Sequence, residues 1–76
     1  MHLEDVFADV FEQPAAAFDD HSNQENTENW TSLAHVRLLV AIETCFGIRF
    51  TNAEMATMRS LGDIRSVLSS KGAMVA

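Results

Sequence analysis

The sequence lacks the features that mark disulfide-rich, membrane-spanning and collagen-like proteins. It contains one cysteine, one proline and three glycines in 76 residues, and a single cysteine cannot form an internal disulfide bond. Its longest apolar run, residues 38–42, is far shorter than the roughly 20 residues of a membrane-spanning helix. The first residues do not form the basic and apolar blocks of a signal peptide. We therefore expect one cytoplasmic globular domain with a single small core and no membrane contact.

Lysine and arginine are missing from the first half of the chain. Residues 1–36 contain eight acidic and no basic residues, whereas residues 37–76 contain five basic and three acidic residues, and the net charge is −6. An acidic surface repels nucleic-acid phosphates and anionic lipids. We therefore expect protein partners, with basic surfaces as the better candidates, rather than nucleic acid or membranes. A helical transcription factor is disfavoured.

Signatures of catalysis and of metal binding are also missing. The three histidines and the cysteine stand at unrelated spacings, which match no metal-ligand pattern. The sequence has no glycine-rich phosphate loop and no nucleophile elbow. These absences predict a protein that is not an enzyme and has no metal site.

Hydrophobic periodicity predicts helices and no strands. A first amphipathic helix is expected over residues 2–12. A polar, aperiodic loop follows over residues 13–31, with Phe18 and Trp30 as its apolar anchors. The strongest helix prediction covers residues 32–46, which are rich in apolar helix formers.

Capping signals divide the next part of the chain. Gly47 suits the left-handed residue that ends the helix over residues 32–46. Thr51 and Glu54 form a capping box, which starts a short third helix that can run only to about residue 58.

A fourth helix is expected to open at residue 60 and to end near residue 72, where lysine and glycine follow one another. Residues 73–76 are expected to fray. The whole chain, residues 1–76, is thus predicted to be one all-α domain. It is a small four-helix bundle with a long first loop and a short third helix.

The middle of the chain reads WTSLAHVRLLVAIETCFGI over residues 30–48. This stretch resembles the Asp-Ser-Leu region and second helix of acyl carrier proteins. The order of elements agrees over essentially the whole chain, including the Phe-Gly-Ile end of the second helix and a fourth helix opened by Ser-Leu-Gly-Asp-Ile. The tryptophan before the motif is similar to that of carrier domains in polyketide and nonribosomal peptide pathways.

The resemblance implies a covalent 4′-phosphopantetheine cofactor on Ser32, whose thiol holds an acyl or related chain. It implies as partners a phosphopantetheinyl transferase and enzymes that load and process acyl chains. The sequence departs from the family pattern at Thr31, where most members have aspartate. It departs again in the second helix, where Arg37 stands and Glu43 is the lone acid, although the family usually displays several acids there.

The residues around Ser32 support its role on separate grounds. If Thr31 is the N-cap, its hydroxyl accepts a hydrogen bond from the first turn, and the Ser32 hydroxyl stays uncommitted. A phosphodiester at that position would lie at the positive end of the helix dipole. The alternative is that Ser32 is itself the N-cap and has no other role.

A helical wheel divides the second helix into two sides. The side expected to face the core holds Leu38, Leu39, Ile42 and Phe46. The opposite side holds Leu33, Arg37, Val40, Ala41 and Thr44. An exposed apolar strip beside Ser32 suits a docking enzyme, so partner docking is assigned to Leu33, Arg37 and Val40. The alternative is that Leu33 and Val40 pack under the long loop.

Three further residues receive structural rather than chemical roles. Trp30 is expected to anchor the loop on the bundle. His35 is expected to be partly buried and hydrogen-bonded, with no catalytic role, because no acid or nucleophile is placed to act with it. Cys45 is expected to be a small packing residue rather than a reactive thiol.

Two functions remain open at this stage. The first is a monomeric acyl carrier protein of fatty acid, polyketide or specialised biosynthesis, which catalyses nothing itself. The second is a carrier-like interaction module that is not phosphopantetheinylated, and Thr31 in place of aspartate motivates it.

Overall fold

The computed structural model describes residues 2–73, which form four α-helices, one short 3₁₀ helix and no strand. The elements are α1 (Leu3–Phe11), η1 (Ala15–Ala17), α2 (Ser32–Phe46), α3 (Asn52–Thr57) and α4 (Leu61–Ser70). The predicted all-α bundle is confirmed, with its long first loop and its short third helix. Ala73 is not frayed, because its N–H donates to the Leu68 carbonyl and it packs against the core. The predicted fraying of residues 74–76 lies outside the described residues.

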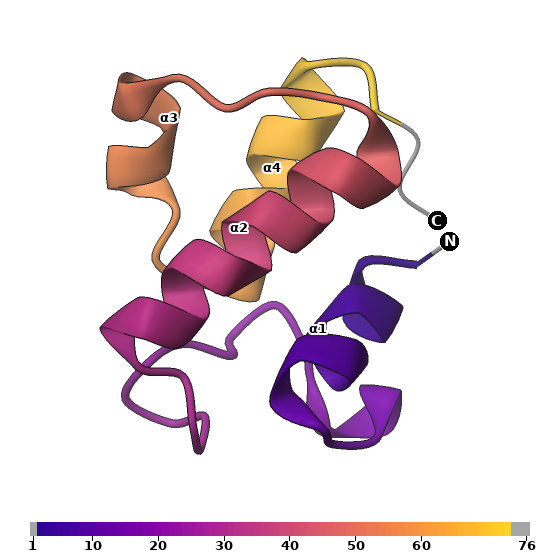
Figure 1. The fold of residues 1–76 in the computed structure, drawn as a ribbon, viewed down its shortest axis with the longest axis vertical. Coiled ribbons are helices and arrows are strands. Elements are labelled where there is room, and N and C mark those ends of the chain that lie inside the picture. The colour runs from indigo at the N-terminus through magenta and orange to yellow at the C-terminus, as the bar shows by residue number, and fades with distance from the viewer. Residues whose placement is uncertain (1, 74–76) are drawn as a thin grey trace.

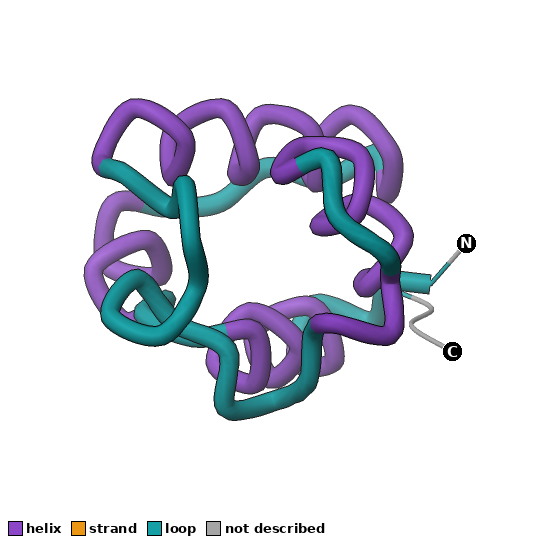
Figure 2. Tube along the Cα trace, turned by 90° about the horizontal axis from the view of Figure 1, so that it is seen from below, coloured by secondary structure: helices purple, strands orange, loops and turns teal. Residues whose placement is uncertain are grey.

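The helices surround a shared centre. Figure 1 shows α2 crossing the molecule diagonally, with α1 on one side of it and α3 on the other. In Figure 2 the helices frame the interior, and the connecting loops run between them along the periphery. The longest helix therefore lies across the bundle and keeps one long side free for other contacts.

The core is a single cluster of apolar side chains, with an aromatic group at its centre. Phe7 of α1 is fully buried, and its ring centroid lies 5.3–5.8 Å from those of three other aromatic rings. Those rings belong to Phe11, Phe18 and Trp30. Since Phe18 and Trp30 come from the long loop, both of its predicted anchors are confirmed.

The long loop also pairs with the start of α4. The N–H of Leu61 donates to the Ser22 carbonyl at 2.9 Å, and the N–H of Gly62 donates to the Asp20 carbonyl at 3.1 Å. These are N–H groups of the first turn, which have no partner inside the helix. The loop thus caps α4, and it buries Ser22 in doing so.

One arginine joins three segments at this place. Arg65 of α4 contacts Glu4 of α1 at 2.6 Å and Asp20 of the loop at 3.0 Å. All three side chains are partly exposed, so the two pairs add modestly to stability, by about 0.2–1 kcal/mol each. Their geometric effect is to hold the loop between α1 and α4.

Replacement of Gly62 tests this docking. In Gly62→Ala the new Cβ would lie 2.9 Å from the backbone oxygen of Asp20, which is too close for a carbon atom. We expect the clash to cost about 1–3 kcal/mol and to outweigh the ~1 kcal/mol that alanine adds to a helix interior. Urea denaturation of Gly62→Ala should therefore show a lower free energy of unfolding. Ser66→Ala, at an exposed position of α4, is the control and should be neutral or stabilising. Equal stability of the two variants would contradict the docking.

Candidate functional site

The start of α2 presents one uncommitted hydroxyl. Thr31 is the N-cap, and its Oγ1 accepts a hydrogen bond of 3.1 Å from the N–H of Ala34. Ser32 is therefore the first residue of the helix. It is exposed, and its hydroxyl makes no hydrogen bond to any of residues 2–73. The prediction that Thr31 caps the helix is confirmed, and the alternative that Ser32 does so is wrong.

The chain enters α2 through a tight turn. Asn29 adopts a left-handed conformation with φ of 69°, which asparagine tolerates better than most residues. Its carbonyl accepts a hydrogen bond of 2.9 Å from the N–H of Thr31. Just upstream, the side-chain amide of Gln13 donates to the Glu28 carbonyl at 3.3 Å. These bonds fix the backbone immediately before Ser32.

Trp30 is the side chain that fastens this turn to the bundle. Only 3% of its surface is exposed, and its ring lies 5.3 Å from Phe7 and 5.5 Å from Phe11. Its indole Nε1–H donates to Nδ1 of His35 at 3.0 Å. His35 is half-buried, and burial lowers its pKa below the ordinary value. The structural roles predicted for both residues are confirmed, but the bond between them was not predicted.

The outer side of α2 is apolar over two turns. Leu33, Val36 and Val40 are 63%, 59% and 55% exposed, so the alternative that Leu33 and Val40 pack under the loop is wrong. The wheel did not assign Val36 to this side. Its spacing, three residues after Leu33 and four before Val40, could have placed it there.

Two predictions for α2 are wrong in detail. Ala41 was placed on the outer side, but it is partly buried and packs against the core. Cys45 was predicted to be a packing residue, but its side chain is exposed. Both residues lie at the edges of the buried stripe, where the helical angle alone does not decide burial.

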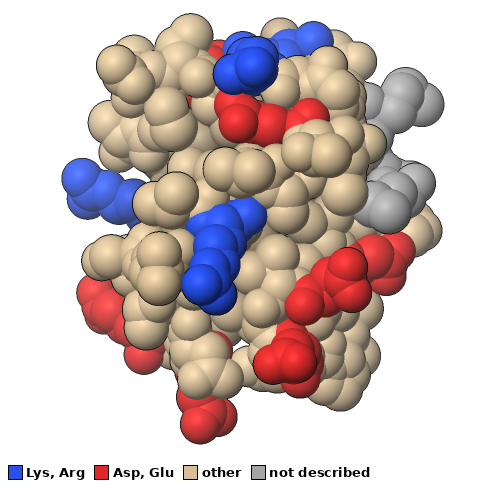
Figure 3. All heavy atoms as spheres, viewed as in Figure 1, with Lys and Arg blue, Asp and Glu red and all other residues tan. Residues whose placement is uncertain are grey.

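Charge on this side of α2 is positive rather than negative. Arg37 is exposed and makes no ion pair with any residue in the described range 2–73. Glu43, the only acid of α2, is partly buried, and its carboxylate accepts a hydrogen bond of 2.8 Å from the N–H of Phe50. In Figure 3 acidic side chains gather over α1 and the lower part of the molecule, whereas the middle of α2 carries a basic side chain among uncharged atoms.

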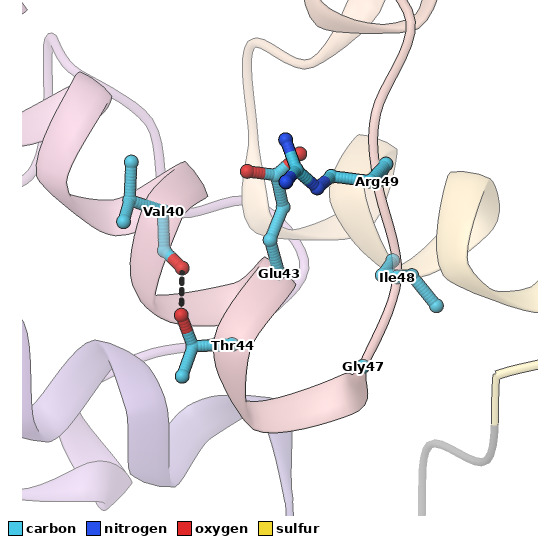
Figure 4. Close-up of a pocket in the computed structure, with 6 residues that line it drawn as sticks. All are labelled: Val40, Glu43, Thr44, Gly47, Ile48 and Arg49. Carbon is cyan, nitrogen blue, oxygen red and sulfur yellow. Dashed lines mark hydrogen bonds between the residues drawn. The ribbon is translucent and has the colours of Figure 1, made fainter.

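Open hollows lie beside the part of α2 that is farther from Ser32. One lies at the end of the helix and is lined by Val40, Glu43, Thr44, Gly47, Ile48 and Arg49 (Figure 4). A second, more apolar hollow lies between α2 and α3, with Val36, Leu39, Val40, Phe50 and Met55 among its lining residues. Val40 is eight residues from Ser32, which is about 12 Å along a helix axis. Ser32 lines neither of these two hollows.

The described residues contain neither a cluster of metal ligands nor a helix that could span a membrane. No group of three or more histidine, cysteine or acidic side chains among residues 2–73 is placed to hold a metal ion. Within the same range, every helix is too short or too polar to cross a membrane.

The fold is similar to that of a protein of known structure. The fold is similar to the solution NMR structure of a holo acyl carrier protein from Geobacter metallireducens, with a TM-score of 0.82 and 25% sequence identity. The match covers 91% of this chain and 79% of the other. The chain therefore has the fold of an acyl carrier protein. No family model and no curated protein matches the sequence itself.

At the start of α2, one residue caps the helix and the next presents a free hydroxyl. Capping is done by Thr31, a neutral residue, and the first turn of the helix contains no acid. The positive end of the helix dipole is therefore not compensated by any acidic side chain of that turn. An exposed hydroxyl at such a place fits an attached phosphodiester, which would bring the negative charge.

Substitutions at the two residues should separate their roles. Thr31→Ala should lower the free energy of unfolding by about 1 kcal/mol, because the N–H of Ala34 loses its partner. Thr31→Asp should keep the cap and change stability by only a few tenths of a kcal/mol. Ser32→Ala should also be nearly neutral, since the hydroxyl makes no bond. Urea denaturation measures all three, and a large loss in Ser32→Ala together with a neutral Thr31→Ala would contradict the assignment of the cap.

Proposed function

We propose that this protein is an acyl carrier protein with a 4′-phosphopantetheine arm on Ser32. It holds an acyl or related intermediate as a thioester and delivers it to enzymes of fatty acid, polyketide or specialised biosynthesis. The observation that carries the proposal is the exposed, uncommitted Ser32 hydroxyl at the N-terminus of α2 in a carrier fold. The similar structure from Geobacter metallireducens is of a holo protein, which supports the same cofactor here.

Attachment requires a partner, a phosphopantetheinyl transferase with coenzyme A as its substrate. The Ser32 Oγ attacks the phosphorus that bears the pantetheine, the phosphoanhydride bond breaks, and adenosine 3′,5′-bisphosphate leaves. The serine proton passes to a base of the transferase. This chain contributes an accessible hydroxyl and a helix N-terminus, which favours the new negative charge by about 0.3–1 kcal/mol. When attached, the arm supplies the thiol that carries the chain.

We propose that the protein itself catalyses nothing. The one histidine near Ser32, His35, uses Nδ1 to accept the Trp30 hydrogen bond and has no carboxylate within ion-pair distance among residues 2–73. A general base needs a free nitrogen within reach of the proton that it removes. The proposal is completed by a cytoplasmic location, a monomeric state, and no binding to nucleic acid or membranes.

The outer side of α2 is the proposed docking surface for partner enzymes. Leu33, Arg37 and Val40 form it, and the exposed Val36 extends it. Exposed apolar side chains in a continuous row are typical of interaction sites, and this row begins next to Ser32. A partner enzyme bound there would have the arm next to the entrance of its active site.

A second candidate function is an interaction module that is never modified. Thr31 favours it, because transferases of this family commonly meet aspartate at that position. Both candidates use the same docking surface, so only the chemistry of Ser32 separates them.

The modification test is direct. The protein incubated with coenzyme A and a broad-specificity phosphopantetheinyl transferase should gain one phosphopantetheinyl group, detected by intact mass spectrometry and located at Ser32 by peptide mapping. Ser32→Ala should gain none, although it folds. Thr31→Asp should be modified at least as fast as the wild type.

Controls decide between the two candidates. Ser66→Ala, which changes an exposed serine of α4, should be modified like the wild type. A wild type that stays unmodified with several transferases would favour the interaction module, and modification at another serine would contradict the proposed site.

The docking surface gives a prediction with a definite sign. Arg37 meets a basic partner surface with like charge, so Arg37→Glu should raise turnover of the loaded protein by a fatty-acid enzyme that has a basic docking surface. We expect a gain of roughly two- to fivefold at low salt, which corresponds to an exposed pair of up to about 1 kcal/mol. The gain should shrink as salt rises, since exposed charges are screened beyond about 8–10 Å.

Arg59→Glu is the matched control, because it reverses an exposed charge outside α2. It should change turnover much less than Arg37→Glu. If both reversals act equally, the effect comes from net charge and α2 is not the electrostatic docking surface.

A further inference from the structure

A hydrogen bond between two side chains, Trp30 and His35, spans the position of Ser32 in the sequence. Trp30 lies two residues before the serine and His35 lies three residues after it, and the indole Nε1–H of one donates to Nδ1 of the other at 3.0 Å. Their rings are also stacked, with centroids 5.9 Å apart and planes inclined by 21°. The turn that leads into α2 is thus fastened to the first turn of the helix itself.

We propose that the Trp30–His35 pair positions Ser32 for modification. Protonation of His35 breaks the hydrogen bond between the two rings, and attachment of the arm thereby becomes sensitive to pH. The inference rests on the proposed function and adds a regulatory feature to the same site. Both partners act through the backbone around Ser32 and touch no substrate, so they are positioning residues.

The chemistry of the two rings makes the bond conditional. An indole N–H can only donate a hydrogen bond, and a histidine nitrogen accepts one only when it carries no proton. Protonation of His35 turns Nδ1 into a donor, so two donors then face each other at 3.0 Å. Trp30 is buried whereas His35 is half-buried, so the histidine ring can turn toward water while the indole stays in the core. The hydrogen bond between the two rings is then lost.

The surroundings keep His35 neutral near pH 7. Burial lowers the pKa of its imidazole. The positive end of the α2 dipole also disfavours a positive charge on a side chain near the start of the helix. The segments packed against the pair are the end of α1 and the loop, and α2 carries the histidine. Their charged residues nearest in sequence are Glu12, Glu28 and Arg37, and none of them, nor any other described residue, makes an ion pair with the His35 ring.

The sign of the pH effect follows from this lowered pKa. The unfolded chain binds a proton on His35 near pH 6.5, whereas the folded protein binds it only at lower pH. The contribution of the neutral ring to stability is therefore complete above about pH 6.5 and is lost as the pH falls through the lower folded value. Loss of the Trp30–His35 hydrogen bond belongs to that acidic window.

Loss of this hydrogen bond should affect Ser32 through a short path. Trp30 precedes the cap residue Thr31, whose N–H is held by the Asn29 carbonyl and whose hydroxyl holds the N–H of Ala34. When the bond to His35 is lost, Trp30 is no longer linked to α2, and the backbone at Thr31 is held less firmly. Ser32 then no longer has one fixed backbone position to offer a transferase.

The first experiment follows Trp30, which is the only tryptophan in the chain. Fluorescence and the indole N–H signal in NMR spectra are recorded from about pH 8 to about pH 5 for the wild type, His35→Gln and His21→Gln. Glutamine can accept the same bond and does not titrate, and His21 is an exposed histidine of the loop. The wild type and His21→Gln should show one transition below about pH 6.5 that His35→Gln lacks. A transition that persists in His35→Gln, or none in the wild type, would overturn the inference.

The second experiment measures modification of Ser32 by one transferase at about pH 7.5 and about pH 5.5. The rate of the wild type is divided by that of His35→Gln at each pH, which removes the transferase's own pH dependence. The ratio should be near one at the higher pH. At the lower pH it should fall about fivefold, the equivalent of one lost hydrogen bond of about 1 kcal/mol. His21→Gln should behave like the wild type.

The outcomes are distinguishable. A wild type that is unmodified at about pH 7.5 contradicts the proposed function and this inference with it. A modified wild type whose ratio stays constant with pH contradicts the inference alone, and it leaves the Trp30–His35 pair with a purely structural role.

Discussion

Burial of Trp30 decides where α2 begins. The loop before the helix is polar and has no periodicity, and Thr31 and Ser32 can both cap a helix, so local signals leave one residue of freedom in where α2 starts. Trp30 removes this freedom, because its ring packs on Phe7 and Phe11 of α1 and its position fixes the next residue as the cap. With Thr31 held there, Ser32 becomes the first helical residue and its hydroxyl is free. The site thus depends on the core.

The same loop explains why the net charge of the protein is a poor guide to the charge on the proposed docking surface. Half of the acids that make the first part of the chain so negative lie in this loop, and two of the five cations are used internally. Arg65 is engaged by Glu4 and Asp20, and Lys71 by Glu54. What remains on α2 is an unpaired Arg37 among apolar side chains. A partner at the proposed surface would meet a positive charge, although the whole molecule is negative. Screening by salt makes the nearby charge more important than the distant ones.

The sequence predicted the elements of this fold well, because helix periodicity and capping residues are local signals. The cap at Thr31 and the capping box at Thr51 came from the same local chemistry. The sequence could not predict contacts between distant parts of the chain, such as that of Gly62 with Asp20. It also could not predict the exposure of residues at the edge of a helical stripe, such as Cys45. A loop without a period carries no signal for its partner, and a wheel does not show how far neighbouring helices extend.

Thr31 can be understood as more than a missing aspartate. An aspartate cap would place a negative charge at the positive end of α2 whether or not Ser32 carries the arm. With threonine, the cap hydrogen bond is kept while the charge is left out, and the first turn of α2 has no other acid. A phosphodiester on Ser32 would therefore be the first negative group in that turn. Attachment would therefore gain the full stabilisation that the helix dipole gives to a negative group. Next to an aspartate cap the gain would be smaller, because the carboxylate would repel the phosphodiester.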